Sequence, residues 1–239
     1  MGAALAAMLA LLTEAQGSSA EPPAEPAMRS ESIGAPMDGS LARGAVLPKR
    51  GAGFSVMRKT LARRARYGTE ELVRLVEDAA AAVRRKDRGA LLAVADLSQR
   101  RGGPFEHHGS HQSGRDLDLA FYMRDAEGKP AIPVDFVAFD HNGYSVDPPM
   151  AFRFDAARNW AIVAALLSSE RAEVQWIFVA EHLKRILLEQ ADTSGANAAL
   201  VAKARRALRQ PGAKSHWDHF HVRVRCPAEG GPVCRDWGR

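Results

Sequence analysis

The chain has 239 residues, of which 46% are hydrophobic and 26% charged, and its formal net charge is +5. This composition excludes a disordered, collagen-like or coiled-coil chain and predicts one globular domain. Beyond the first dozen positions there is no apolar run of about 18 residues or more, which excludes a membrane-spanning bundle. Two cysteines exclude a four-thiolate zinc site and a disulfide-dense scaffold.

The N-terminus has the features of an export signal. Met1–Leu12 is apolar but too short to span a membrane, and Ser18, Ser19 and Ala20 offer small residues for cleavage. We expect a signal peptide at 1–20, a linker rich in Pro, Ala and Glu at 21–31, and one domain at 32–239. No Lys or Arg precedes the apolar run, so a frayed N-terminal helix is the alternative.

Helices and strands are mixed along the domain. Thr69–Lys86 is predicted as a helix because Thr69 is a suitable N-cap, acidic residues follow it, and apolar residues recur at helical spacing. Further helices are predicted from Asp155, at Glu181–Gln190 and at Ala196–Arg209, and strands at Leu91–Ala95, Leu117–Tyr122, Gln175–Val179 and Phe220–Arg225. Since no regular strand-helix-strand order appears, we expect an α+β fold with a small, mainly antiparallel sheet flanked by helices.

Two stretches are rich in basic residues. We interpret both as solvated helix faces rather than binding sites. Their members are Arg58, Lys59, Arg63, Arg64 and Arg66 in the first run, and Lys203, Arg205, Arg206 and Arg209 in the second.

The two cysteines lie close together near the C-terminus. Cys226 and Cys234 are eight positions apart, and the residues between them include two Gly and two Pro. Such a loop brings two cysteines within disulfide range. In an exporting compartment the pair would be oxidised, whereas in the cytosol it would remain as two thiols. We favour export and the disulfide.

Six of the eight histidines fall in residues 107–111 and 216–221. In a strand at Leu117–Tyr122, Asp118 and its neighbour Asp116 point to one face, and in the last strand His219 and His221 share a face. Burying carboxylates and imidazoles without partners is unfavourable, and a metal ion resolves this.

A catalytic zinc ion takes three protein ligands, and His111, Asp118 and His221 would supply two imidazoles and one carboxylate. The alternative is that residues 102–114 form a polar surface loop and that the His-x-His pair binds nothing.

At these residues the sequence resembles a known family. Residues 110–118, SHQSGRDLD, and 216–227, HWDHFHVRVRCP, are similar to the motifs of the penicillin-insensitive murein endopeptidases. These belong to a wider group of zinc peptidases with lysostaphin, the D-Ala-D-Ala peptidases and the sonic hedgehog domain. Weaker similarities occur at residues 32–34, 56–58, 66–68 and 177–179. The resemblance implies a hedgehog/D-Ala-D-Ala peptidase-like fold.

The resemblance also implies roles for individual residues. His111, Asp118 and His221 match the zinc ligands, and His219 and His216 match catalytic histidines. His108 matches a residue that is linked to an additional metal in some members.

The sequence departs from the family at Asp218, where a small residue is more familiar. It also lacks a convincing counterpart for the other ligands of a second metal, since Asp140 and His141 do not align well; this argues against a second zinc. Asp116 is interpreted either as a residue that orients a ligand imidazole or as a structural partner for Arg115 or a loop amide.

The implied function is zinc-dependent hydrolysis of the D-alanyl–diaminopimelate cross-link of peptidoglycan in the periplasm, insensitive to β-lactams. The positive charge fits a polyanionic wall substrate, and no aromatic-interleaved basic motif or recognition helix points to nucleic acid. Stable membrane insertion after signal removal is not expected. The alternatives are a D,D-carboxypeptidase or D-Ala-D-Ala dipeptidase on the same scaffold, and a zinc-stabilised wall-binding module without turnover.

Overall fold

The computed structural model describes residues 29–106, 108–212, 216–227 and 233–236. The predicted signal peptide and most of the predicted linker lie outside these residues, and Glu31, placed in the linker, already begins the first strand. Within the described residues no helix combines the length and the apolar character that a membrane crossing needs.

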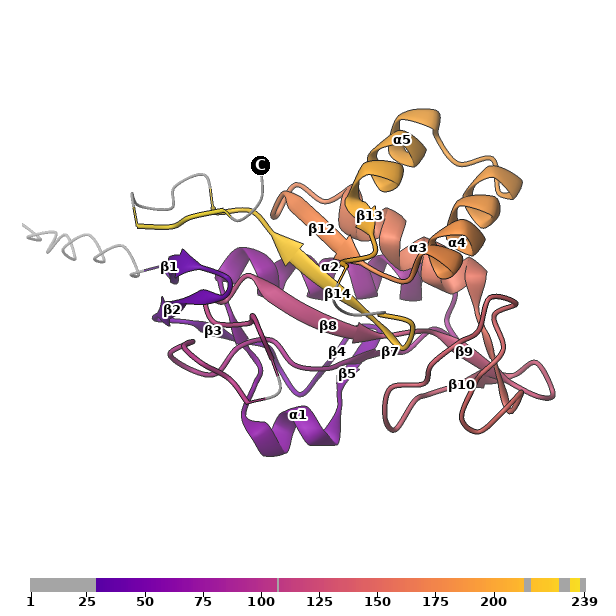
Figure 1. Ribbon diagram of the computed structural model, residues 1–239, viewed down its shortest axis with the longest axis horizontal. Helices are drawn as coiled ribbons and strands as arrows, with labels where there is room; N and C mark the ends of the chain where they lie inside the picture. Colours follow the sequence, from indigo (N-terminus) through magenta and orange to yellow (C-terminus); the bar gives the residue numbers. More distant parts are fainter. Residues whose placement is uncertain (1–28, 107, 213–215, 228–232, 237–239) are drawn as a thin grey trace, which may run out of the picture.

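The main sheet has seven strands in the described part of the chain (Figure 1). In spatial order they are β13 (Leu208–Arg209), β12 (Val174–Phe178), β14 (His219–Val224), β8 (Asp116–Ala120), β7 (Leu92–Val94), β5 (Phe54–Val56) and β4 (Arg50–Gly51). The β12–β13 and β5–β7 pairs are parallel, and the other four are antiparallel. The α+β class and the mainly antiparallel sheet are therefore confirmed. The sheet is larger than predicted, because two-residue edge strands such as β4 show no periodicity in the sequence.

Three smaller sheets complete the strands. They are the hairpin β1 (Glu31–Ala35) and β2 (Asp38–Ala42), the pair β3 (Ala45–Val46) and β6 (Tyr67–Gly68), and the three strands β9 (Met123–Asp125), β10 (Pro130–Ala131) and β11 (Phe152–Phe154). None of these short strands was predicted.

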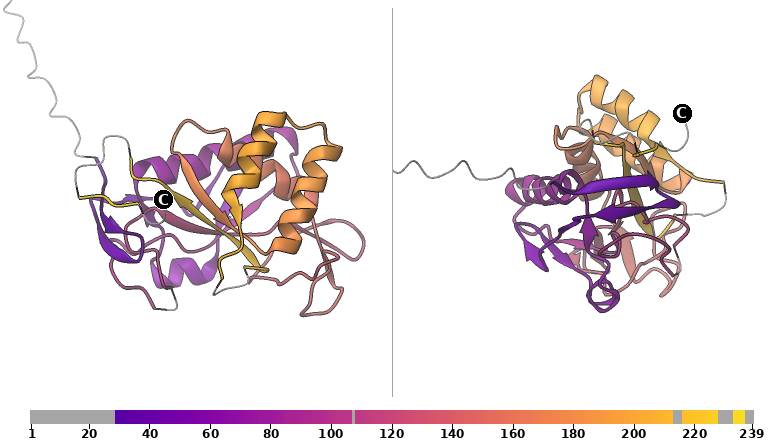
Figure 2. Two further views of the ribbon diagram at one scale, coloured as in Figure 1. Left: turned by 45° about the horizontal axis from the view of Figure 1, so that its top comes forward. Right: turned by 90° about the vertical axis from the view of Figure 1, so that its left-hand side faces the viewer.

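Four helices cover the apolar face of the main sheet. They are α2 (Glu70–Lys86), α3 (Ala156–Leu167), α4 (Glu181–Thr193) and α5 (Ala198–Ala207), whose buried residues share one core with Leu117 and Phe220 of the central strands. Helix α1 (Arg58–Arg63) lies apart from these four helices, on the other side of the main sheet (Figures 1 and 2). There a small cluster that includes Met57 and Ala120 packs beside the polar face of the sheet.

Local sequence signals set the boundaries of the long helices. The Thr69 side chain accepts a hydrogen bond from the Leu72 amide, and Asp155 caps α3 in the same way through the amide of Arg158. The predicted helix at Ala196–Arg209 was wrong at its end, because α5 stops at Ala207. Leu208 is fully buried and pairs with Ile177 of β12, so sheet pairing overrides helix propensity there.

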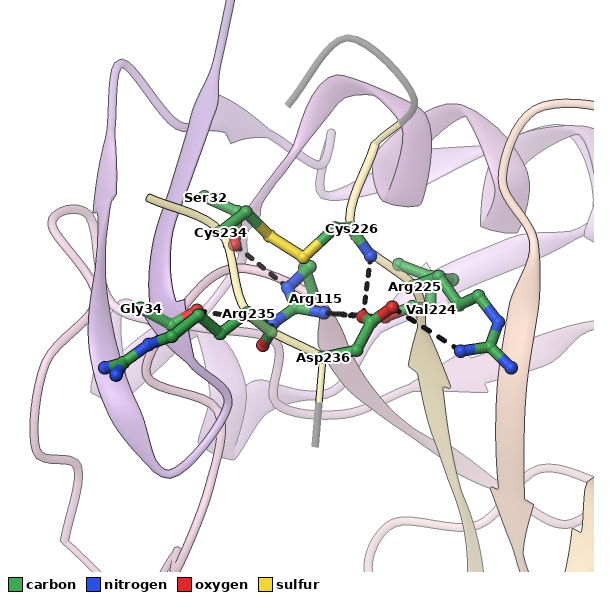
Figure 3. The surroundings of a disulfide bond; sticks show 9 residues. All are labelled: Ser32, Gly34, Arg115, Val224, Arg225, Cys226, Cys234, Arg235 and Asp236. Atoms are coloured by element: carbon green, nitrogen blue, oxygen red, sulfur yellow. Dashed lines mark hydrogen bonds and ion pairs between the residues drawn. A yellow bond between two sulfur atoms is a disulfide. The ribbon is translucent and has the colours of Figure 1, made fainter. Parts of the chain in front are cut away.

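The C-terminal segment is fastened back onto the first strand. The predicted disulfide is present, with the Cys226 and Cys234 Cα atoms 5.9 Å apart, and Cys234 forms a parallel bridge with Gly34 of β1 (Figure 3). Asp236 accepts hydrogen bonds from the fully buried Arg115 guanidinium at 2.8 Å and from the Cys226 amide at 2.9 Å. The segment thus supplies the counter-charge of a buried cation (Figure 3).

Replacing Asp236 by Ala is expected to lower the free energy of unfolding by about 2 kcal/mol, because it leaves the buried Arg115 charge without its carboxylate. Urea unfolding with the disulfide kept oxidised measures this. The matched control is Asp38→Ala, because Asp38 is 94% exposed and lies 3.9 Å from Arg235 of the same segment. An exposed pair of this kind contributes little, so a similar loss in both variants would contradict the prediction.

Candidate metal centre

Strand pairing brings the predicted acidic and basic residues together. In the antiparallel register of β8 and β14, Asp118 lies opposite His221 and Asp116 opposite Arg223. Side chains alternate between faces, so all four project from the face opposite the main core, as the sequence pattern predicted for Asp116, Asp118 and His221. Asp116, Asp118, His221 and Arg223 are each at most 7% exposed.

The loop before β8 adds two more histidines to this face. His111 has a positive φ of 68°, and its amide donates a hydrogen bond to Asp116 Oδ2 at 3.0 Å. His108 stacks on Phe105 and contacts Asp96 Oδ2 through Nε2 at 3.0 Å. The loop therefore folds back over the sheet and places both rings beside Asp118.

Four imidazole rings lie around the carboxylate of Asp118. Its Oδ1 lies 3.2 Å from His221 Nδ1, 3.4 Å from His111 Nε2 and 3.6 Å from His219 Nε2. Its Oδ2 lies 3.8 Å from His108 Nδ1. One ligand atom from each of His108, His111 and Asp118 also falls within 4.8 Å of the others, so this trio offers an overlapping ligand set.

This arrangement fits a metal ion. Ligand atoms about 2.0–2.1 Å from a tetrahedral zinc lie about 3.3 Å from one another, close to the separations of Asp118 Oδ1 from His221 and His111. His111 Nε2 and Asp118 Oδ1 are buried and lack a hydrogen-bond partner. Leaving two such atoms unpaired is unfavourable, and a shared cation satisfies both.

His111 and His221 are each oriented by a contact at the ring nitrogen that points away from Asp118. His111 Nδ1 lies 2.7 Å from the Leu97 carbonyl oxygen, an acceptor that requires a proton on Nδ1. The lone pair of the neutral ring is then on Nε2, where it is available to a metal ion. His221 Nε2 lies 3.1 Å from Asp116 Oδ1, so its Nδ1 faces Asp118. Asp116 thus contacts both an imidazole and a loop amide. The cation that pairs with it is Arg223, at 2.6 Å, whereas Arg115 hydrogen-bonds to Asp236.

The charges of the cluster are strongly coupled. Burial raises the pKa of Asp116, but the charge of Arg223 and the hydrogen bond from His221 outweigh it and hold that pKa far below its usual range. Burial also opposes ionisation of Asp118, yet nearby His111 and His219 lower its pKa well below the ordinary value. Burial lowers the pKa of His221, but the hydrogen bond to Asp116 and the charges of Asp116 and Asp118 raise it to about 9. Without metal, the two carboxylates therefore favour the protonated form of His221.

One cavity of about 440 Å³ opens onto this cluster. The predicted metal-binding and catalytic side chains all line it, namely His108, His111, Asp118, His216, His219 and His221. His216 is 9% exposed, and its ring centroid lies 5.2 Å from that of His219. Phe136 and Phe178 form apolar walls.

Several residues of the site were not predicted. Lys59 and Arg63 belong to a basic run interpreted as a solvated helix face, yet both line the cavity. Asp96 is buried and accepts hydrogen bonds from Thr60 and Arg63, both at 2.7 Å, while also contacting His108. No local motif marks Asp96, which only follows a short apolar strand.

The residues considered for a second metal lie elsewhere. The Asp140 carboxylate accepts hydrogen bonds from the amides of Asn142 and Tyr144 in a turn, and His141 is exposed. Neither lines the cavity.

Comparisons with known proteins identify relatives of the chain. The profile of the family described as penicillin-insensitive murein endopeptidase matches residues 32–237. The chain is 31% identical over 245 residues to the protein of that name from Klebsiella pneumoniae strain 342, covering 96% of this chain and 80% of the relative. Proteins of the same name from Yersinia pestis bv. Antiqua strain Antiqua and Pectobacterium atrosepticum are 29% and 28% identical. Both alignments cover 83% of this chain, with 67% and 66% of the relatives respectively.

Stability of the metal-free protein should fall as the pH rises through about 9. The folded-state pKa of His221, about 9, lies above the ordinary value of 6.5. The contribution of the protonated His221 to the free energy of unfolding is therefore fully present below about pH 6.5 and is lost as His221 deprotonates. The expected loss is on the order of 3 kcal/mol. Urea unfolding of chelator-treated protein between about pH 6 and pH 10 measures this.

The variant His221→Gln should lose this pH dependence, whereas His141→Gln, at an exposed histidine outside the cavity, should retain it. Equal pH dependence in the wild-type protein and His221→Gln would show that the charge of His221 does not stabilise the fold.

Proposed function

The chain belongs to the family of penicillin-insensitive murein endopeptidases, and we propose that it is a zinc-dependent hydrolase of the D-alanyl–diaminopimelate cross-links of peptidoglycan. Family membership supports a hydrolase acting on murein. The observation that supports zinc is the buried, unpaired pair His111 Nε2 and Asp118 Oδ1, with His221 Nδ1 beside them. The hedgehog/D-Ala-D-Ala peptidase-like fold is part of the same proposal.

His111, Asp118 and His221 are the proposed zinc ligands. Two imidazoles and one carboxylate leave a fourth position for water, as in catalytic zinc sites. A zinc ion held by these residues would supply Lewis acidity toward the scissile carbonyl and would lower the pKa of a bound water toward about 7. Asp116 and the Leu97 carbonyl hold the two ligand imidazoles in the tautomers that binding requires. His108 remains a candidate ligand of a second metal.

His219 and His216 are the proposed catalytic histidines. His219 Nε2 faces Asp118 Oδ1 at 3.6 Å, on the side of the proposed zinc ligands. In this role His219 accepts a proton from the attacking water and returns it to the amine that leaves. His216 lines the same cavity and assists by a hydrogen bond to the substrate or to the developing oxyanion.

The cavity has a mixed lining. Lys59, Arg63 and Arg223 contribute cations to it, each already paired with a carboxylate of the chain, and Phe136 and Phe178 contribute apolar walls. The net charge of +5 supports an anionic wall substrate. No serine is acylated in this scheme, which supports insensitivity to β-lactams.

A periplasmic location is part of the proposal. The Cys226–Cys234 disulfide supports an oxidising compartment. The apolar N-terminal run supports export through a signal peptide at 1–20, followed by a linker and the catalytic domain at 32–239.

Zinc-loaded protein should convert cross-linked muropeptide dimers into monomers, and a chelator should abolish this until zinc is restored. Mass spectrometry identifies the products. Removal of D-alanine from monomers alone would instead favour the carboxypeptidase or dipeptidase, and binding to sacculi without soluble products would favour the wall-binding module. Turnover that is unaffected by the chelator would contradict zinc dependence.

Two single variants should separate ligand from base. His221→Ala is expected to lose the ion, and His219→Ala to retain about one zinc per chain while turnover falls about 100- to 10,000-fold. Metal analysis and digestion of muropeptide dimers measure the two effects, with His141→Ala as the control. An His221→Ala protein that still holds one zinc would overturn the ligand assignment.

A further inference from the structure

Asp218 and His219 form a direct contact at the start of β14. Asp218 Oδ1 lies 2.7 Å from His219 Nδ1, a distance typical of a charge-assisted hydrogen bond. The His219 side chain is 17% exposed and that of Asp218 34% exposed, so the pair sits at the cavity rim. Asp218 does not line the cavity, whereas His219 does.

This contact determines which nitrogen of His219 carries the proton. A neutral imidazole has one N–H, and a carboxylate only accepts hydrogen bonds. The proton of His219 therefore lies on Nδ1, and the lone pair lies on Nε2. That nitrogen faces Asp118 Oδ1 at 3.6 Å, on the side of the proposed metal ligands.

The plane of the His219 ring is fixed by a second contact. Phe136 stacks on it with ring centroids 4.3 Å apart and an interplanar angle of 12°. The Lys59 ammonium lies 3.9 Å from the centroid of the Phe136 ring and also pairs with Asp135, so the stacking residue is itself held. The tautomer and the plane of His219 thus have separate determinants.

We propose that Asp218 is a positioning residue of the hydrolytic site, which keeps the His219 proton on Nδ1 and presents an unprotonated Nε2 to the attacking water. Asp218 acts through His219 and is not part of the cavity lining. When Nε2 takes the proton of the water, Nδ1–H stays bound to Asp218, and the carboxylate stabilises the imidazolium until Nε2 passes the proton to the leaving amine. This inference rests on the proposed function, because it assigns His219 the part of the base.

The tautomer can be observed without any measurement of activity. Two-bond ¹H–¹⁵N correlation spectra of zinc-loaded, ¹⁵N-histidine protein are recorded at a pH at which the ring is neutral, with His219→Gln used to assign the resonance. We expect the proton on Nδ1 in the wild-type protein and a mixture of tautomers in Asp218→Ala. A wild-type spectrum with the proton on Nε2 would overturn the proposal, whatever the variant does.

Kinetics on muropeptide dimers give the second readout. Asp218→Ala should lower kcat about 10- to 100-fold while KM and zinc content stay within about twofold of the wild-type values. Asp218→Glu keeps a carboxylate and should recover part of kcat. Asp192→Ala, at an exposed carboxylate on α4, should behave as the wild-type protein.

The two readouts must change together. A changed tautomer with unchanged kcat, or a lowered kcat with an unchanged tautomer, would each overturn the proposal. Failure of the zinc-loaded wild-type protein to cleave dimers would instead refute the proposed function, and the spectra would still report where the His219 proton lies.

Discussion

The burial of two carboxylates on one short strand constrains the whole polar face of the sheet. Asp116 and Asp118 are both almost inaccessible to water, and a buried carboxylate without partners is strongly unfavourable. The oxygens of Asp116 are occupied by Arg223, His221 and the His111 amide, so this carboxylate is fully compensated by protein groups. Asp118 Oδ1 has three imidazole nitrogens around it and no hydrogen bond. On the same face of β8, the carboxylate of Asp116 is therefore saturated by protein groups, whereas that of Asp118 has an oxygen without a hydrogen bond. Of the two, Asp118 is the one suited to bind a metal.

The same strand also links the site to the end of the chain. Arg115 directly precedes Asp116, and its fully buried guanidinium reaches Asp236 and the Arg235 carbonyl of the C-terminal segment (Figure 3). The disulfide closes that segment into a loop and so limits the freedom of Asp236 to leave. Arg115 and Asp116 belong to separate networks, although they are consecutive residues at the start of β8. The position of the carboxylates thus depends on residues more than a hundred positions away in the chain.

The features that follow from residue periodicity were predicted from the sequence, whereas contacts between residues far apart in the chain were not. Alternation in β8 and β14 was enough to place Asp118 and His221 on one face, because the period of two leaves no other choice once Leu117 and Phe220 are buried. The helix N-cap at Thr69 was predicted for the same local reason. The site positions of Asp96 and Lys59 were not predicted. Asp96 pairs with Arg63, 33 positions away, and Lys59 pairs with Asp135, 76 positions away, and no local sequence pattern indicates such distant pairs. Similarity to relatives at 31% identity establishes the family but leaves such contacts to the structure.

Three histidines of the site are oriented in the same way: one ring nitrogen contacts a fixed oxygen atom, and the other faces Asp118. In His111 the Nδ1 nitrogen is held by a backbone carbonyl, in His221 the Nε2 nitrogen is held by Asp116, and in His219 the Nδ1 nitrogen is held by Asp218. In every case the remaining nitrogen turns toward Asp118 Oδ1, at 3.2 to 3.6 Å. The partner of His221 is a buried carboxylate fixed by an arginine, which suits the role of metal ligand proposed for His221, because any rotation of the carboxylate would break a buried ion pair. The partner of His219 is a partly exposed carboxylate, so in the proposed role of base a change in the charge of the ring would leave the core of the sheet undisturbed. This difference in burial is a physical reason to assign the proposed ligand and the proposed base to two different residues of the same strand.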